Sequence, residues 1–576
     1  MLFKNLDKWA KEKGIPVNSL AGKSRPGRNI DRKETRSILP LNEPPMMYRA
    51  QVQGRCNLQF GGENSDRQKW TREWILAQSQ NSNFKPSHQY IYESLDSDHP
   101  NYLIHSIKIK FSYRVLSNSG QDSILRPVLT VHGIPFIPGS SVKGLFKRSI
   151  KDKPTDSPDR EKVSIYCGTE KVPGTLRFHG AYPIGDWSNQ MVDIVHPQQS
   201  RQVENNCSTS AFALISFYEP EFVFEFSSIN EEINWEDVKR ILHEALTLGL
   251  GGKTSTGYGF SSKDIPAYAT KNSSLFNNAI HLRLEGTGVS SKLLSGNPEF
   301  RPNMFKAALR GHISRLLAGV CDDKSRIQQV TDDLFGSTIS PGTAQIYWQH
   351  IEEVILDSRE RRKNNPVYKA KGNLHILASE TDRQFLESVL DFAYIMGGFG
   401  KTWRRVSHEI FYPSYLKQPN KFDIGCHWTS PLSDHITISN RTTLTTFLDQ
   451  LYQSCQKYLE IKSPTFVHQW REAWHPENVS VYSQVFNESQ AVKLFHQEPF
   501  KYTPAIGGRE RRGEPKFISS VWHRMLPIGN KQYLEIVTIF NGNHGQWQNQ
   551  RQNQRQAFIT SLTSKGLELT WGSGLN

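Results

Sequence analysis

The sequence lacks several features that mark particular classes of protein. It contains no run of about 18 apolar residues, the length at which a helix can cross a membrane. The amino-terminal residues include Lys4, Asp7 and Lys8, so they form no apolar signal core. We therefore expect a cytoplasmic protein with no membrane partner.

Cysteine pairs are missing as well. The cysteines are scattered along the chain, and no two of them form a Cys-x-x-Cys motif. This spacing argues against both a disulfide framework and a thiolate zinc site. We expect buried free thiols at these positions, which are Cys56, Cys167, Cys207, Cys321, Cys426 and Cys455.

The sequence shows no recognisable pattern of catalytic residues either. The histidines are dispersed, and the closest acidic grouping, Asp322-Asp323 with Asp332-Asp333, is more typical of a solvated loop and helix cap than of a metal site. The glycine-rich run Gly249–Gly259 is not a Walker loop, because it follows a helical pattern and lacks the required glycine spacing. We therefore expect no metal, no cofactor and no ATP binding.

Positive charge is what the sequence does have. Its 70 basic residues exceed its 56 acidic residues, which gives a net charge of +14. Such a balance suits a polyanionic partner such as nucleic acid, although a solvated basic surface would have the same charge. The length of 576 residues predicts two or more domains.

An internal repeat divides the chain into related copies. Gly168 and Pro173-Gly-Thr175 recur at one constant offset as Gly336 and Pro341-Gly-Thr343. Upstream and downstream of this element, two further segments recur in the same order. Ser140–Lys147 parallels Asn303–Arg310, each after a proline, and Gly249–Thr254 parallels Gly397–Thr402. An ordered set of three matches indicates two copies of one module.

The hydrophobic pattern within each copy predicts its fold. Ile107, Ile109, Phe111, Tyr113 and Val115 share one face of a strand, and Lys108, Lys110, Ser112 and Arg114 form a basic opposite face. A helix follows Pro138, where a serine can cap it, and further helices are expected at 235–248 and 384–396. The order β-α-β-β-α-β predicts an α+β protein with two ferredoxin-like modules in tandem.

Two motifs of the first copy resemble the RAMP superfamily, whose members form the backbones of type III CRISPR effector complexes. Gly133-Ile-Pro-Phe-Ile-Pro-Gly-Ser-Ser-Val-Lys-Gly144 resembles the family's entry to its first helix, and Gly249–Gly259 resembles its glycine loop. Within the family, the first copy is similar to the sixth subunit of the Cmr (type III-B) complex, which shares this loop and Asp193-Ile-Val-His-Pro197. The second copy is similar to the first Cmr subunit through Arg301-Pro, Leu309-Arg-Gly311, Leu334-Phe-Gly336 and Gly397–Arg405.

The basic composition of the amino-terminal segment and the resemblance together predict a division of the chain into three parts. Residues 1–47 would form a basic, partly flexible arm, and residues 48–270 the first RAMP module, with its core at 104–260. Residues 271–576 would form the second module, with its core at 280–408 and an extension at 409–576. The chain would thus fuse two capping positions of the assembly.

The resemblance also implies a function. We expect a non-catalytic RNA-binding scaffold of a type III effector ribonucleoprotein in antiviral defence. It would hold the crRNA towards its 3′ end, help engage complementary target RNA and contact other effector subunits. Cutting subunits of the family carry an aspartate in the loop after the first strand, and Asp122 lies in such a loop. Cleavage of target RNA at a metal-supported Asp122, crRNA processing by an endoribonuclease and a stand-alone RNA-binding regulator are the alternatives.

Glycine loops and basic side chains are the expected RNA-binding elements. Backbone amides of glycines can come close to phosphate, and neighbouring lysines and arginines add charge. The same glycines could instead permit tight packing of a helix end against the sheet. The candidate residues are Lys143, Lys147, Gly251, Gly252, Lys253, Thr254, Lys306, Arg310, Gly400, Lys401, Arg404 and Arg405.

Overall fold

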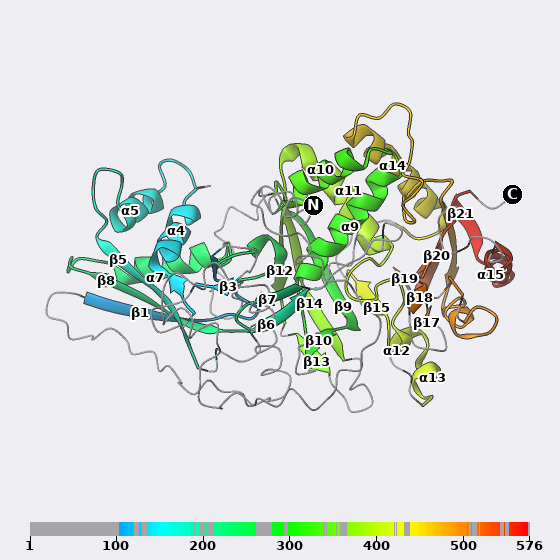
Figure 1. Ribbon diagram of the computed structural model, residues 1–576, viewed down its shortest axis with the longest axis horizontal. Helices are drawn as coiled ribbons and strands as arrows, with labels where there is room; N and C mark the ends of the chain where they lie inside the picture. The colour runs from blue at the N-terminus through cyan, green and yellow to red at the C-terminus, as the bar shows by residue number, and fades with distance from the viewer. Residues whose placement is uncertain are drawn as a thin grey trace, which may run out of the picture. The chain divides into compact units, whose positions relative to one another are not determined.

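The computed structural model describes residues 103–573, apart from gaps (Figure 1). The longer gaps are 120–125, 129–134, 196–211 except Val203, 261–278, 358–365 and 431–437. The predicted arm at 1–47, as well as Cys56, Asp122 and Cys207, lies outside the described residues.

The first module contains an antiparallel sheet with the strand order β1-β8-β5-β4. Its strands are β1 (Leu103–Lys110), β4 (Ile137–Pro138), β5 (Leu176–Ile184) and β8 (Glu221–Ser228). Its helices are α4 (Gly139–Ser149), α5 (Pro158–Cys167) and α7 (Trp235–Leu246). Figure 1 shows α4 and α7 on one face of this sheet. After β1, Leu116 forms bridges with Gly251 and Gly252. The glycine loop thus lies where the last strand of a ferredoxin-like module would pair with the first.

The second module repeats this plan with a complete fourth strand. Its sheet has the order β12-β14-β9-β15, in which the third and first strands are central, as in a ferredoxin-like fold. The strands are β9 (Ile280–Val289), β12 (Gln345–His350), β14 (Val367–Leu377) and β15 (Cys426–Thr429). The helices are α9 (Asn303–Ala318), α10 (Lys324–Phe335) and α11 (Glu380–Ile395).

A third sheet lies in the region expected to be an extension. Its order is β19-β20-β16-β21, again with the third and first strands central. It is built from β16 (Val479–Phe486), β19 (Val521–Gly529), β20 (Gln532–Phe540) and β21 (Glu568–Gly572), with α14 (Arg441–Tyr458) and α15 (Gln552–Ser564). One hydrophobic core joins it to the second module, because Trp474 and Trp522 belong to the same cluster as Phe392.

The remaining elements are short. In the first module they are β2 (Asn118–Ser119), β3 (Arg126–Pro127), β6 (Val192–Val195), β7 (Phe212–Ile215) and the 3-10 turn η2 (Thr254–Thr256). In the second they are β10 (Ser291–Lys292), β11 (Pro298–Glu299) and β13 (Ile355–Asp357). Further on lie α12 (His408–Phe411), α13 (Pro413–Leu416), η5 (Leu494–His496), β17 (Gly508–Arg509) and β18 (Pro515–Phe517).

The predicted α+β class with tandem modules is confirmed, and the paired glycines of the repeat have matching geometry. Gly168 ends α5 at φ 76° and ψ 162°, and Gly336 ends α10 at φ 81° and ψ 158°. Pro138 and Pro302 both occupy N-cap positions, of α4 and α9, but their ψ angles differ, at 146° and −22°. The two copies therefore share the backbone conformation at these helix ends but not at the starts of α4 and α9.

Three details of the predicted first module are wrong. The strand expected over 107–115 ends at Lys110. No serine side chain caps α4, because the helix already begins at Gly139 and Pro138 occupies its N-cap. Arg114 does not face solvent, because only 5% of it is exposed and its guanidinium binds Glu299 of the second module at 2.5 Å. Lys108 and Lys110 are exposed, as expected.

Within the described residues, no helix is both long and apolar enough to span a membrane. The four cysteines that the structure describes, Cys167, Cys321, Cys426 and Cys455, are buried free thiols, which confirms the expectation for them. Burial raises the pKa of each thiol of Cys167, Cys426 and Cys455, so these groups remain protonated at neutral pH.

Candidate nucleic-acid interface

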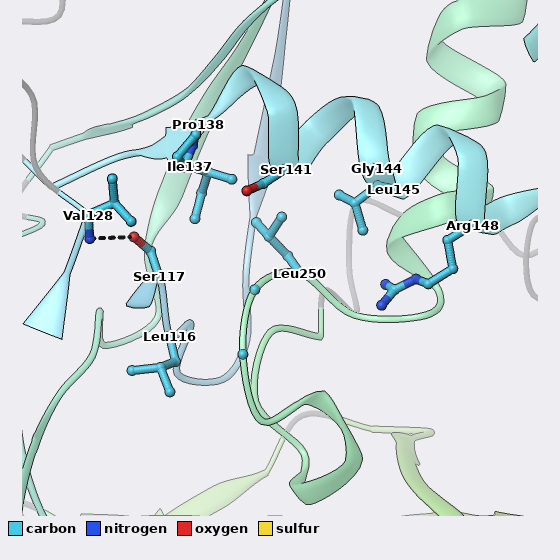
Figure 2. Close-up of a pocket in the computed structure, with 12 residues that line it drawn as sticks. Leu116, Ser117, Val128, Ile137, Pro138, Ser141, Gly144, Leu145, Arg148 and Leu250 are labelled. Atoms are coloured by element: carbon cyan, nitrogen blue, oxygen red, sulfur yellow. Dashed lines mark hydrogen bonds between the residues drawn. The ribbon is translucent and has the colours of Figure 1, made fainter. Parts of the chain in front are cut away.

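A pocket of about 330 Å³ lies between α4 and the glycine loop of the first module (Figure 2). Ser141, Gly144 and Arg148 of α4 line one side, and the backbone of Gly251 and Gly252 lines the other. A hydroxyl and a guanidinium are groups that bind phosphate oxygens. The pocket therefore combines the two motifs that the sequence singled out.

The glycines of this loop are required by its backbone conformation. Gly251 has a φ of +78°, and a Cβ atom there would lie 2.3 Å from the Leu116 carbonyl oxygen. The Gly252 amide donates to that same carbonyl at 2.7 Å, and the Gly259 amide donates to the Arg114 carbonyl at 2.7 Å. These glycines therefore permit close packing of the loop against Leu116. The pocket lies beside this packed backbone.

The far end of the loop packs against the second module. The Lys306 ammonium donates to the Ser255 hydroxyl at 2.8 Å. A Cβ atom on Gly257, which has a φ of +91°, would lie 2.9 Å from the Pro302 side chain. Thr254 belongs to the same half-buried 3-10 turn. This end of the loop joins the two modules.

The basic residues of α4 differ in their surroundings. Lys147 is exposed and Lys143 is half-buried. The Arg148 guanidinium donates to the carbonyls of Leu248 and Gly249 at 3.2 and 2.5 Å, so it ties the helix to the start of the glycine loop. Lys253 begins the 3-10 turn in the left-handed region and is half-buried. Arg148 lines the pocket, whereas Lys143, Lys147 and Lys253 do not line it and add positive charge elsewhere on the module.

The corresponding residues of α9 are engaged within the protein. Lys306 is 9% exposed, and burial together with the neighbouring Arg310 lowers its pKa to about 8. The Arg310 guanidinium pairs with Asp332 and also donates to the Gly336 carbonyl at 3.0 Å. Asp323 caps α10, as expected, whereas Asp332 lies within α10 and anchors an arginine instead of facing solvent in a loop.

The second glycine segment leads into a buried ion cluster. Gly400 has a φ of +90°, and Lys401 is exposed. Arg404 is 8% exposed, binds the fully buried Glu472 and donates to the Ser519 carbonyl at 2.6 Å. Arg315 also binds Glu472, at 2.6 Å.

Arg471 completes this cluster at 3.1 Å from the Glu472 carboxylate. Burial alone would raise the pKa of Glu472, but the three guanidinium groups hold it below its ordinary value. Arg404 therefore points into the protein, whereas Arg405 is half-buried. Sequence reasoning missed Arg315, Arg471 and Glu472, because nothing local indicates such long-range partners.

Among the described residues, no group of three or more histidine, cysteine, aspartate or glutamate side chains is placed to hold a metal ion.

Sequence reasoning also missed a cluster of His408, His496, Tyr412 and Tyr415 beyond the second glycine segment. The aromatic run Phe411–Tyr415 was its only local signal.

Residues 60–262 match the sequence model of the RAMP superfamily. This part of the chain is a RAMP module. A curated relative, the CRISPR system CMR subunit Cmr6 of Saccharolobus solfataricus, is 28% identical over 130 residues, which are 22% of this chain and 43% of the relative. The chain thus spans less than half the length of the curated relative that it matches.

Several solved structures show more distant likeness. Cmr1 from Pyrococcus furiosus in its apo form is 13% identical, with 51% of this chain and 98% of that chain covered and a TM-score of 0.33. Cmr6 from Pyrococcus furiosus is 19% identical, with 28% and 97% covered and a TM-score of 0.20. A chain of the type III-B Cmr-beta complex bound to cognate target RNA is 20% identical, with 28% and 58% covered and a TM-score of 0.22.

Proposed function

We propose that this chain is a non-catalytic RNA-binding subunit of a type III-B CRISPR effector ribonucleoprotein. It holds the crRNA towards its 3′ end, helps to engage target RNA and contacts neighbouring subunits. The observation that carries the proposal is the RAMP module at residues 60–262, with its pocket between α4 and the glycine loop. The Cmr6 relative supports the choice of complex.

The Ser141 hydroxyl and the Arg148 guanidinium that line the pocket, together with the exposed Lys147, support phosphate contact in the first module. The Gly251 and Gly252 backbone lines the pocket opposite α4, and Lys147 projects into solvent from the same helix. Contacts of this kind do not depend on base identity, because the phosphates are the same at every position. A subunit that holds guides of many different sequences needs that kind of contact.

Purification from the native host tests the proposal. The full chain, tagged and isolated at low salt, should bring down repeat-derived RNA together with other effector subunits. A matched purification with Lys143→Gln and Lys147→Gln should recover less RNA. Recovery of the wild-type chain with neither repeat-derived RNA nor partner subunits would contradict the proposal and favour a stand-alone RNA-binding regulator.

A cleavage assay tests the non-catalytic part. Complex assembled with Asp122→Ala should cut target RNA as fast as wild-type complex does, because this subunit is proposed to contribute no catalytic group. Isolated chain should also leave guide precursor intact. Loss of target cleavage in the variant would instead make Asp122 a catalytic residue.

A further inference from the structure

Three half-buried rings lie together at α12, α13 and η5. The rings of Tyr412 and Tyr415 stack with centroids 5.5 Å apart and an interplanar angle of 22°. His496 lies against both, with its ring centroid 4.2 Å from that of Tyr415 and 5.7 Å from that of Tyr412. All three residues are half-buried, so the cluster lies near the protein surface and not in a closed core.

A second layer holds these rings in place. The buried His408 lies with its Nε2 atom 2.7 Å from Nε2 of His496. The buried Asp423 accepts a hydrogen bond from the His408 amide at 2.9 Å and another from the Ser407 hydroxyl at 3.1 Å. These bonds fix the start of α12, so the ring cluster is anchored in the protein.

Positive charge surrounds the rings. The Lys421 ammonium lies 5.2 Å from the centroid of the Tyr415 ring. Burial and then the charges of Arg405, Lys421 and Lys501 lower the pKa of His496 to about 4. Burial and then His496 and Arg405 lower the pKa of His408 to about 3. Both imidazoles are therefore neutral at neutral pH, and the charge lies in the lysines and the arginine.

Flat rings bordered by cations are the elements that bind single-stranded nucleic acid, because bases stack on the rings and phosphates meet the charges. Hydrophobic packing alone does not require cations around a neutral ring cluster, and bringing like charges together is unfavourable. The packing of α12 is also already provided by Phe411, whose ring contacts His427 and Tyr533.

We propose that Tyr412, Tyr415 and His496 form a platform on which an unpaired RNA base stacks, while Lys421 contacts the adjacent phosphate. This inference rests on the proposed function, since it adds a second RNA contact far along the chain from the first-module pocket. It gives the carboxy-terminal region, beyond the second glycine segment, a direct role in holding RNA.

Fluorescence of a single-stranded RNA oligonucleotide that contains 2-aminopurine tests the platform, with the full chain as binding partner. Stacking on the rings should quench the fluorophore in the wild-type complex. Tyr415→Ala should reduce the quenching and weaken binding about tenfold, whereas Tyr415→Phe should keep both. Lys421→Gln should keep the quenching but lower the salt dependence of binding, by about 1 in the slope of log K against log salt.

Tyr452→Ala is the matched control. Tyr452 is another half-buried tyrosine, whose hydroxyl donates to the Gly319 carbonyl at 3.2 Å and whose ring contacts His475 and Trp571 rather than the platform. Its removal should leave RNA affinity unchanged. If circular dichroism shows that Tyr415→Ala does not fold, Tyr412→Ala in the same quenching assay tests the platform instead.

The outcomes separate this inference from the proposed function. Wild-type chain that binds the RNA, together with a folded Tyr415→Ala or Tyr412→Ala of equal affinity and equal quenching, would overturn the platform and leave the proposed function standing. Wild-type chain that does not bind the RNA at all would overturn both. Loss of quenching in the alanine variants with retention in Tyr415→Phe and Tyr452→Ala would support the platform.

Discussion

The first helices of the two modules carry basic residues at the same two positions and use them differently. Lys143 and Lys147 of α4 correspond to Lys306 and Arg310 of α9. Lys147 projects into solvent, whereas Lys306 is buried against Ser255 and Arg310 is paired with Asp332. The first helix therefore leaves the charge of Lys147 in solvent, while the second uses its basic residues for internal support.

The glycine segments show the same division. Gly249 and Gly397 follow the second helix of their modules with φ of 80° and 77°. In the first module the loop turns back along Leu116 and lines a pocket. In the second the chain continues to Arg404 and the buried Glu472. The glycine segment after the second helix thus lines a candidate binding site in the first module. In the second module it leads to the ion cluster that attaches the third sheet.

Of the substitutions that test this comparison, Glu472→Gln should change the stability of the protein most. The substitution removes the carboxylate that compensates three buried guanidinium groups, and it should lower the free energy of unfolding by about 3–5 kcal/mol. Denaturant unfolding monitored by tryptophan fluorescence measures it, with the exposed Glu488→Gln as control. A Glu472→Gln protein as stable as the control would show that the cluster does not hold the second module and the third sheet together.

Gly251→Ala should have the next largest effect. Its positive φ and the nearby Leu116 carbonyl leave no room for a Cβ atom, so we expect a loss of about 2 kcal/mol in the first module. Gly144→Ala is the matched control, since a Cβ atom there meets nothing within 4 Å and alanine favours a helix. The control should gain about 0.5–1 kcal/mol. Equal thermal midpoints for the two variants would contradict the assigned loop geometry.

Lys306 should have a smaller effect on stability, and this effect should depend on pH. Its pKa is about 8 in the folded protein against an ordinary value of 10.5, so the unfolded chain binds more protons between these values. Its contribution should therefore make the folded protein more stable as pH rises from about 8 to 10.5, by on the order of 1–2 kcal/mol. Unfolding of wild type and Lys306→Met across this range measures it, and parallel pH profiles would contradict the buried, desolvated lysine.

The sequence predicted the α+β class and the paired modules because both depend on local patterns, such as the alternation at 107–115 and the recurring glycines. It did not predict the partners of Arg114, Arg310 and Arg404, which only the tertiary fold brings close. The third sheet was missed although it has one local signal. Asn530 and Lys531, both at positive φ, form a two-residue turn between β19 and β20.

The salt dependence of RNA affinity tests most directly the claim that, of the two first helices, α4 contacts RNA and α9 does not. Lys143→Gln with Lys147→Gln should weaken binding and lower the slope of log K against log salt by about 1–2. Lys306→Met with Arg310→Gln should leave the slope unchanged wherever the protein is folded, as should Lys324→Gln, an exposed control on α10. An unchanged slope for the first pair, or an equal drop for the second, would contradict the account.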